Sequence, residues 1–326
     1  MAEYLLDIKG LRTAFKTPVG YVDAVRGIDV YVKENEILGI VGESGSGKSV
    51  CMKSVMGLLP RMAKVRAEGF AYKGEDLLLK KEKEMRRYRG REMAMIFQDP
   101  MTALNPLRTI GYHMTEVIRR YRKCSKKEAA QIAVDMLAQV GIPAPERRMK
   151  QYPHEFSGGM RQRVMIAMAL SCQPSLLIAD EPTTALDVTI QAQILDLLKE
   201  LKEKNNMSVV LISHDMGVMA NMCDRIAVMY GGVIVECGTV DEIFYHPQHP
   251  YTKALLKSIP HPEESRGTVL HAIPGAPPSL QKLPKGCPFS TRCDHTCAAC
   301  AETMPEKTVF SENHHARCHL LGRKEN

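Results

Sequence analysis

Long apolar runs are missing from this sequence of 326 residues. No stretch of about 18 apolar residues occurs, so we expect no membrane-spanning helix. The start, MAEYLLDIKG, has no basic region followed by an apolar stretch, and we expect no secretory signal. Hydrophobic residues are 44% and charged residues 25% of the chain, which excludes the disordered, collagen-like and low-complexity classes.

A strong charge of either sign is also missing, because 44 Lys and Arg against 37 Asp and Glu leave a formal net charge of +7. That excess allows nucleic acid or anionic lipid as a partner but requires neither. Cysteine is not scarce: the chain has 10. Half of them lie in the last 40 residues, and in a reducing cytosol such a cluster predicts metal binding before disulfides.

The order of predicted elements indicates an α/β fold. Turn residues and short apolar runs predict a small antiparallel sheet over 4–35, and EILGIVG (36–42) predicts a buried strand that enters a glycine-rich loop. Two further apolar runs with an amphipathic helix between them predict a parallel crossover unit. We expect a helical region at 110–150, in which Ser125 and Glu128 form a capping box. The two crossover strands are expected at 175–180 and 208–214, and a hairpin at 226–237 that turns at Gly231–Gly232. A domain boundary is expected at 245–260.

A phosphate-binding loop follows the strand at 36–42. The sequence GESGSGKS has the spacing G-x-x-x-x-G-K-S, in which glycines turn successive N–H groups toward phosphate oxygens and a helix N-terminus follows. Lys48 is expected to reach the β- and γ-phosphates and Ser49 to ligate Mg²⁺. The predicted ATP-binding residues here are Gly42, Ser44, Gly45, Ser46, Gly47, Lys48, Ser49 and Val50.

A carboxylate pair ends the predicted strand at 175–180. Asp180 is expected near Mg²⁺, and Glu181 is expected to polarise the attacking water as the general base. Alone, the pattern would fit an acidic turn equally well, but the phosphate loop favours the catalytic interpretation.

The segment Ser157–Gly158–Gly159 precedes an apolar helix and offers a second anion-binding turn. Read by itself it could be a plain helix cap. SGGMRQR, lying upstream of ADEP, resembles the signature of ATP-binding cassette (ABC) ATPases, with Met160 where Gln is usual. The serine and the glycine backbone do the phosphate work in that family.

The resemblance extends to further motifs in the family's order. Gln98 in MIFQDP matches the loop glutamine that touches the metal, so it joins Ser49 as a predicted Mg²⁺ contact. Ala185–Leu186–Asp187 matches the loop that crosses the dimer interface, and His214 matches the switch histidine at the γ-phosphate. The family commonly stacks an aromatic on adenine, for which we choose Phe15, with Tyr21 as the alternative.

The resemblance covers 4–260 and implies a RecA-like core, an antiparallel β subdomain and a helical subdomain at about 100–165. It divides the chain into an ATPase domain, 1–255, and an extension, 256–326. It also implies two cassettes that sandwich two ATP molecules, each signature completing the partner's site. On this resemblance we expect ATP to close the dimer and hydrolysis led by Glu181 to reopen it.

The type of ABC protein is indicated by what accompanies the cassette. There is no room for a long coiled coil and only one cassette, so DNA-repair and translation ATPases fit poorly, and we expect no nucleic-acid partner. HPQHPYTKALL (246–256), DPMTALNP and GCPF resemble dipeptide and oligopeptide import ATPases. That resemblance implies a translocase with two membrane permease subunits, two ATPase chains and an external binding protein. It favours two related ATPase chains, with two copies of this chain as the alternative. The chain would lie peripherally on the cytoplasmic face of the membrane. A nickel importer of the same architecture is the alternative, and a soluble nucleic-acid ATPase is the more distant one.

The cysteine tail predicts a metal site. Cys287, Cys293, Cys300 and Cys318 resemble the four-cysteine tail that holds a [4Fe-4S] cluster in some peptide-import ATPases, in a structural role. Zinc remains open as the alternative, because an additional Cys297 forms C-A-A-C with Cys300 and four histidines lie nearby: His295, His314, His315 and His319.

Overall fold

The computed structural model describes residues 4–18, 20–184, 186–259 and 273–321. The chain forms two compact units. Unit 1 consists of residues 1–33, 37–79 and 212–326, and unit 2 of residues 34–36 and 80–211.

An antiparallel sheet in unit 1 confirms the one expected near the N-terminus. The long strand β1 (Leu6–Thr17) pairs along one edge with β2 (Gly20–Val32) and along the other with two short strands. Leu6 and Ile8 are buried in alternation, and after a register shift between Ile8 and Leu11 the buried positions continue with Leu11; all three are at most 3% exposed. The short strands are β4 (Ala63–Arg66), β5 (Gly69–Tyr72) and β6 (Glu75–Asp76).

The second sheet of unit 1 carries the phosphate loop. Strand β3 (Ile37–Val41) is buried throughout and pairs in parallel with β10 (Arg225–Tyr230), which forms the expected hairpin with β11 (Val233–Thr239). Gly231 and Gly232 have φ angles of 52° and 83°, the left-handed values that a two-residue hairpin turn favours. Beyond β11 lie β13 (His315–Ala316) and β12 (Thr308–Val309) from the C-terminal segment.

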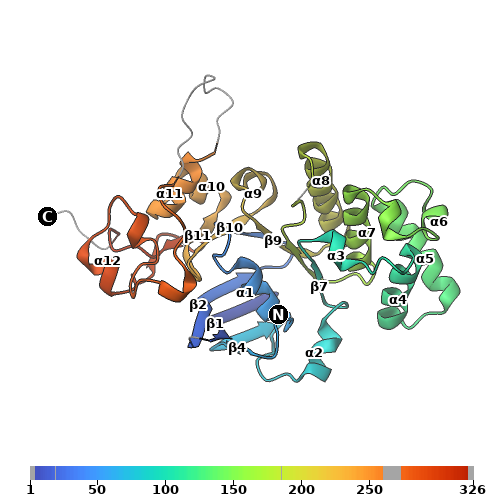
Figure 1. Cartoon of the computed structure of the whole chain (residues 1–326), viewed down its shortest axis with the longest axis horizontal. Coiled ribbons are helices and arrows are strands. Elements are labelled where there is room, and N and C mark those ends of the chain that lie inside the picture. The colour runs from blue at the N-terminus through green and yellow to red at the C-terminus, as the bar shows by residue number, and fades with distance from the viewer. Residues whose placement is uncertain (1–3, 19, 185, 260–272, 322–326) are drawn as a thin grey trace, which may run out of the picture. The chain divides into compact units, whose positions relative to one another are not determined.

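The helices of unit 1 are short, and several of them pack on the second sheet (Figure 1). Tyr230, Tyr251 and Phe289 join β10, a helix and the extension in one buried cluster with ring centroids 4.5–5.3 Å apart. The helices and 3₁₀ turns are α1 (Lys48–Val55), α9 (Met216–Met222), α10 (Val240–Tyr245), α11 (Pro250–Lys257), η2 (Leu280–Lys282), η3 (Ser290–Arg292) and α12 (Ala298–Glu302).

Unit 2 contains the predicted crossover. Strands β7 (Met93–Ile96) and β8 (Leu176–Asp180) are parallel, and β8 leads through α8 (Val188–Asn205) to β9 (Ser208–Ser213). Along the chain, β9 runs from residues of unit 2 into residues of unit 1. Every residue of β8 and β9 is buried, which explains their unbroken apolar pattern.

The predicted helical subdomain is present in unit 2, where α4, α5 and α7 pack side by side (Figure 1). The expected capping box starts α5: Ser125 Oγ accepts from the Glu128 N–H at 3.2 Å, and Glu128 Oε2 accepts from the Ser125 N–H at 2.8 Å. The helices are α2 (Glu82–Tyr88), α3 (Pro100–Ala103), α4 (Ile110–Arg122), α5 (Lys126–Gln139), α6 (Pro145–Arg148), η1 (Pro153–Glu155) and α7 (Gly158–Leu170). In the described part of the chain, no helix has both the length and the apolarity to cross a bilayer.

Candidate nucleotide site and cysteine centre

The phosphate loop joins β3 to α1 and requires glycine for steric reasons. Gly47 has a φ angle of 103°, and a Cβ there would lie 2.4 Å from the Ala24 carbonyl oxygen. At Gly42 a Cβ would lie 2.0 Å from the Met229 oxygen. The loop backbone therefore passes too close to its neighbours for any side chain at these two positions, as a tight phosphate cradle needs.

Lys48 is folded back onto this loop. Its Nζ donates to the carbonyl oxygens of Gly42 at 2.6 Å and Glu43 at 3.0 Å, and the residue is only 5% exposed. The two carbonyl oxygens offset part of the cost of burying this polar group.

The carboxylate pair lies in unit 2 at the end of β8. Asp180 is fully buried, whereas Glu181 is half-buried with a φ angle of 46°, a left-handed conformation that is strained for glutamate. Glu181 Oε2 accepts hydrogen bonds from Gln98 Nε2 at 2.8 Å and from Thr184 Oγ1 at 2.9 Å. The structure thus brings the predicted base and the predicted loop glutamine together. Thr184 was not singled out by the sequence, because nothing distinguishes it from other threonines.

The signature turn begins α7. Ser157 is exposed, and its Oγ accepts from the Met160 N–H at 3.3 Å, so it caps the helix. A Cβ at Gly159 would lie 2.7 Å from Ile190 Cγ2 on α8, whereas at Gly158 the nearest atom, of Leu186, would be 3.4 Å away. One glycine is therefore needed for packing, and the serine hydroxyl lies at the surface.

The other predicted contacts lie in different elements. Asp187 is exposed and caps α8 by accepting from the Ile190 N–H at 3.0 Å; the neighbouring Ala185 lies outside the described residues. His214 is exposed directly after β9. Phe15 lies in β1 opposite Val22, and the assignment of adenine stacking to it remains a prediction.

A cavity of about 390 Å³ in unit 1 borders the phosphate loop. Its wall includes Glu43–Ser46 of the loop, Val22 of β2, and Pro277–Gln281 of the extension. The extension therefore contributes part of the surroundings of the phosphate loop, which the sequence did not predict.

The four tail cysteines line one small cavity. Cys287, Cys293, Cys300 and Cys318 all border it, together with His249, His295 and His319. The Cys287 N–H donates to the Cys300 carbonyl at 2.9 Å, which ties two of these segments together. Cys297 is not part of this lining, but its sulfur lies 3.4 Å from that of Cys300.

Burial governs the ionisation of these thiols. Burial, helped by the neighbouring cysteine sulfurs and opposed by a hydrogen bond from the Phe289 N–H, raises the pKa of Cys287 to about 12. The pKa values of Cys293 and Cys318 are also raised by burial, while a backbone N–H two residues ahead hydrogen-bonds to each sulfur and opposes the rise. Among the described residues, no three His, Cys, Asp or Glu side chains lie close enough together to hold a metal ion.

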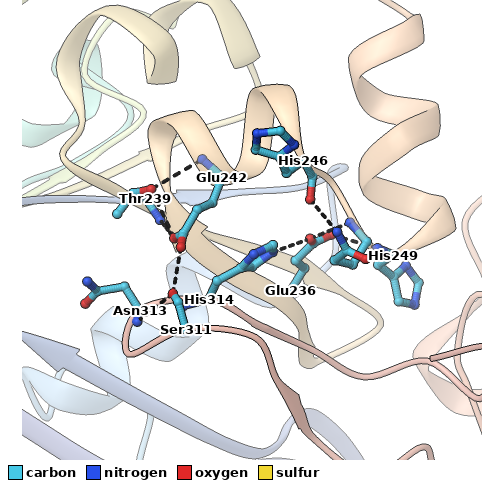
Figure 2. Close-up of polar contacts among 9 residues, drawn as sticks. Glu236, Thr239, Glu242, His246, His249, Ser311, Asn313 and His314 are labelled. Atoms are coloured by element: carbon cyan, nitrogen blue, oxygen red, sulfur yellow. Dashed lines mark hydrogen bonds and ion pairs between the residues drawn. The ribbon is translucent and has the colours of Figure 1, made fainter. Parts of the chain in front are cut away.

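A buried polar network attaches the tail to β11, and Figure 2 shows Glu236 between His314 and His249. Glu236 is fully buried and accepts from the backbone N–H groups of Gln248 and His249 at 2.7 and 2.9 Å. His314 Nε2 lies 2.9 Å from Glu236 Oε1. His314, one of the histidines considered for zinc, is therefore engaged with a carboxylate. His249 Nδ1 accepts from the Tyr251 N–H at 3.0 Å, and its buried Nε2 has no hydrogen-bond partner among the described residues.

Comparison with known proteins identifies the family. The family model described as "ABC transporter" matches residues 25–184. A second family model, described as "Oligopeptide/dipeptide transporter, C-terminal region", matches residues 235–300. The dipeptide transport ATP-binding protein DppD of Bacillus subtilis (strain 168) is 52% identical over 319 residues, 98% of this chain and 95% of the relative. This chain belongs to the ABC transporter family.

Other relatives agree with that assignment. The oligopeptide transport ATP-binding protein OppD of Escherichia coli (strain K12) is 49% identical over 304 residues, 93% of this chain and 90% of the relative. A solved dimeric structure of an ATP-binding cassette in a post-hydrolysis state, bound to ADP and phosphate, has a TM-score of 0.64 at 27% identity, covering 72% of this chain and 98% of that one. The ABC ATPase fold expected from the motifs is confirmed, and the activity of the chain is ATP hydrolysis.

Proposed function

We propose that this ABC ATPase powers the import of dipeptides or oligopeptides through a separate membrane permease. The observation that carries the proposal is the near full-length similarity to DppD and OppD, which includes the C-terminal region matched at 235–300. The nickel and nucleic-acid alternatives are not favoured by these relatives.

In the proposed reaction the chain's own residues bind ATP, and they orient and deprotonate the attacking water. Lys48 moves from its two carbonyl acceptors to the phosphates of ATP, and the loop N–H groups hold the phosphate oxygens. Ser49, Gln98 and Asp180 would hold Mg²⁺, which neutralises phosphate charge when bound. Glu181 orients the attacking water and takes its proton, with Gln98 and Thr184 fixing the carboxylate oxygen. His214 contacts the γ-phosphate.

We assign the exposed Ser157 turn and Asp187 to a facing ATPase chain's nucleotide. Ser157, Gly158 and Gly159 present a helix N-terminus at the surface of unit 2, which suits an anion brought by a partner. The solved relative with a TM-score of 0.64 is dimeric. The proposed assembly pairs this chain with a related ATPase and two permease subunits, and an external binding protein delivers the peptide. The chain then works at the cytoplasmic face of the membrane, with 1–255 as the ATPase domain and 256–326 as the extension.

We also propose that the cysteine cavity holds a [4Fe-4S] cluster. In such a cluster each thiolate binds a different iron, so the ligands surround a cavity rather than a point, and Cys287, Cys293, Cys300 and Cys318 line one cavity. Three of them receive a backbone N–H at sulfur, as cluster thiolates commonly do. Bound iron would supply the cation that draws protons from these buried thiols, and the group would hold the extension together.

Reconstitution tests the transport proposal. Proteoliposomes are prepared with the chain, its partner ATPase, the permease pair and the binding protein. ATP is supplied on the side of the membrane that carries the ATPases. We expect labelled di- and tripeptides to enter and to accelerate ATP hydrolysis. The peptide assignment is wrong if nickel stimulates ATP hydrolysis, or if none of the peptides of two to five residues does. Either result would leave the assignment as an ATPase intact. Analysis of iron and acid-labile sulfide in the anaerobically purified chain tests the cluster. Finding stoichiometric zinc instead would show that the site is a zinc site.

A further inference from the structure

The extension grips the phosphate loop through one arginine. Arg292 immediately precedes the tail cysteine Cys293, yet its guanidinium pairs with Glu43, the second residue of the loop. The pair is bidentate, with Nη1–Oε2 at 2.6 Å and Nη2–Oε1 at 3.1 Å. The side chains are only 5% and 24% exposed. This geometry is the strong, orientation-specific form of an arginine–carboxylate contact.

The guanidinium is fixed by further partners in unit 1. Nε donates to the Pro274 carbonyl at 2.7 Å, Nη2 to the Ile273 carbonyl at 3.1 Å, and Nη1 to the Tyr230 hydroxyl at 3.1 Å. The extension therefore presents Arg292 to the loop in one orientation.

Glu43 is also one of the two residues whose carbonyl oxygens hold Lys48; the other is Gly42. The Glu43 carbonyl oxygen accepts from Lys48 Nζ at 3.0 Å, and the Glu43 N–H donates to the Tyr251 hydroxyl at 3.0 Å. Side chain, N–H and carbonyl of one residue are thus bound to Arg292, Tyr251 and Lys48. A shift of the Glu43 side chain would move the peptide that positions the phosphate-binding ammonium group.

We propose that Arg292 is a positioning residue for the phosphate loop: it sets the loop conformation that binds nucleotide and so couples nucleotide affinity to the integrity of the cysteine-bearing extension. A simpler role is attachment of the extension to the core. Buried ion pairs are weak evidence for net stability, however, and this pair ends on the nucleotide loop rather than on the outer surface. The inference concerns nucleotide binding and does not depend on what is transported.

Binding of a fluorescent N-methylanthraniloyl-ADP to the full-length chain tests the proposal, because ADP is not consumed. We expect Arg292→Ala and Glu43→Gln each to weaken binding about tenfold or more. Arg292→Lys keeps the charge but loses the fork, and we expect an intermediate loss; it also serves if the alanine variant does not fold. The double variant Arg292→Ala/Glu43→Gln should be no weaker than either single variant, since both remove the same contact.

His314→Gln is the matched control. It breaks a buried tail-anchoring contact, His314–Glu236, that does not touch the loop. We expect it to lower the melting temperature but to leave the dissociation constant for labelled ADP within twofold of the wild-type value. Binding is measured well below the melting temperatures of the wild type and the variant. Equal weakening by His314→Gln and Arg292→Ala would show that attachment alone matters and would overturn the proposal, as would an unchanged affinity in Arg292→Ala and Glu43→Gln.

A separate experiment tests the coupling between the cysteine-bearing extension and nucleotide binding. Cys293→Ser, next to Arg292, should weaken ADP binding in the wild-type background and have no further effect in the Arg292→Ala background. Additive effects of the two substitutions would mean that the extension reaches the loop by another route, and the coupling through Arg292 would then be wrong.

Discussion

Gln98 Nε2 donates a 2.8 Å hydrogen bond to Glu181 Oε2. The two residues are 83 positions apart, but they follow β7 and β8, which are neighbouring parallel strands whose carboxyl ends meet at one edge. The amide can only donate through Nε2, so Glu181 Oε2 is the acceptor of this hydrogen bond. This contact orients the proposed base before nucleotide arrives.

Glu181→Gln should bind ATP normally and hydrolyse it negligibly. The amide is isosteric but cannot take a proton from water, and loss of a general base typically costs about 10²–10⁴-fold in rate. Phosphate release in steady state and labelled-ATP affinity are the measurements. Glu146→Gln, on an exposed residue of α6, is the control and should hydrolyse at the wild-type rate. Turnover of Glu181→Gln within tenfold of wild type would remove the base assignment.

Adjacent glycines of the signature turn should respond differently to alanine. Gly159→Ala places a Cβ 2.7 Å from Ile190 Cγ2, and a β-branched side chain yields poorly, so we expect a loss of about 1–3 kcal/mol in unfolding free energy. Gly158→Ala meets its nearest atom only at 3.4 Å and should melt like wild type. Thermal denaturation compares the two.

Gly158→Ala should nevertheless lose ATPase activity at least tenfold, because a methyl group would cover the N–H groups that we assign to a facing nucleotide. Normal turnover of a normally folded Gly158→Ala chain would contradict that assignment.

The strands, the loop and the crossover were predictable because each has a local signal. The β3 and β8 strands are buried on both faces, so they read as unbroken apolar runs, and the loop at Gly42–Ser49 needs glycine wherever its backbone approaches a neighbour. Ser125 and Glu128 satisfy two helix N–H groups within one turn, so they too could be found from spacing alone.

The contacts around Glu43 could not be predicted in this way. Arg292 is 249 residues away from it, and neither residue stands in a pattern that distinguishes it from other charged residues. Likewise Thr184 contacts Glu181 within the turn after β8, where the glutamate has a left-handed φ. Long-range pairing and backbone conformation decide these contacts, and a single sequence carries no local trace of them.

His315 should make the chain less stable in mild acid. Burial and, to a smaller extent, the cations Lys307, Arg317 and Arg225 lower its pKa to about 4, against an opposing effect of Asp29. Since the folded pKa lies below the unfolded value of about 6.5, the unfolded chain binds the proton first. Stability is therefore full above about pH 6.5 and falls as pH drops toward 4.

Melting temperatures at pH 7.5 and 5.5 measure this effect. Because His315 is only partly buried, we expect it to account for at most about 1 kcal/mol of the loss at pH 5.5. His315→Gln should lose less stability than wild type between the two pH values, whereas His154→Gln, on an exposed histidine, should behave as wild type does. Identical pH dependence in all three proteins would show that His315 is not buried in the neutral form.

Cys297 and Cys287 should differ in what they contribute to the proposed cluster. Cys287 lines the cavity with the three other tail cysteines, is 7% exposed and receives a backbone N–H at sulfur. Cys297 is not part of that lining; it occupies the N-cap position of α12, and its sulfur lies 3.4 Å from that of Cys300. In anaerobically purified protein, Cys297→Ser should therefore keep the broad visible absorbance and the iron content of wild type, and Cys287→Ser should lose both. If Cys297→Ser also loses iron, the fifth cysteine is a ligand, and the assignment of the four cavity-lining cysteines as the complete set is wrong.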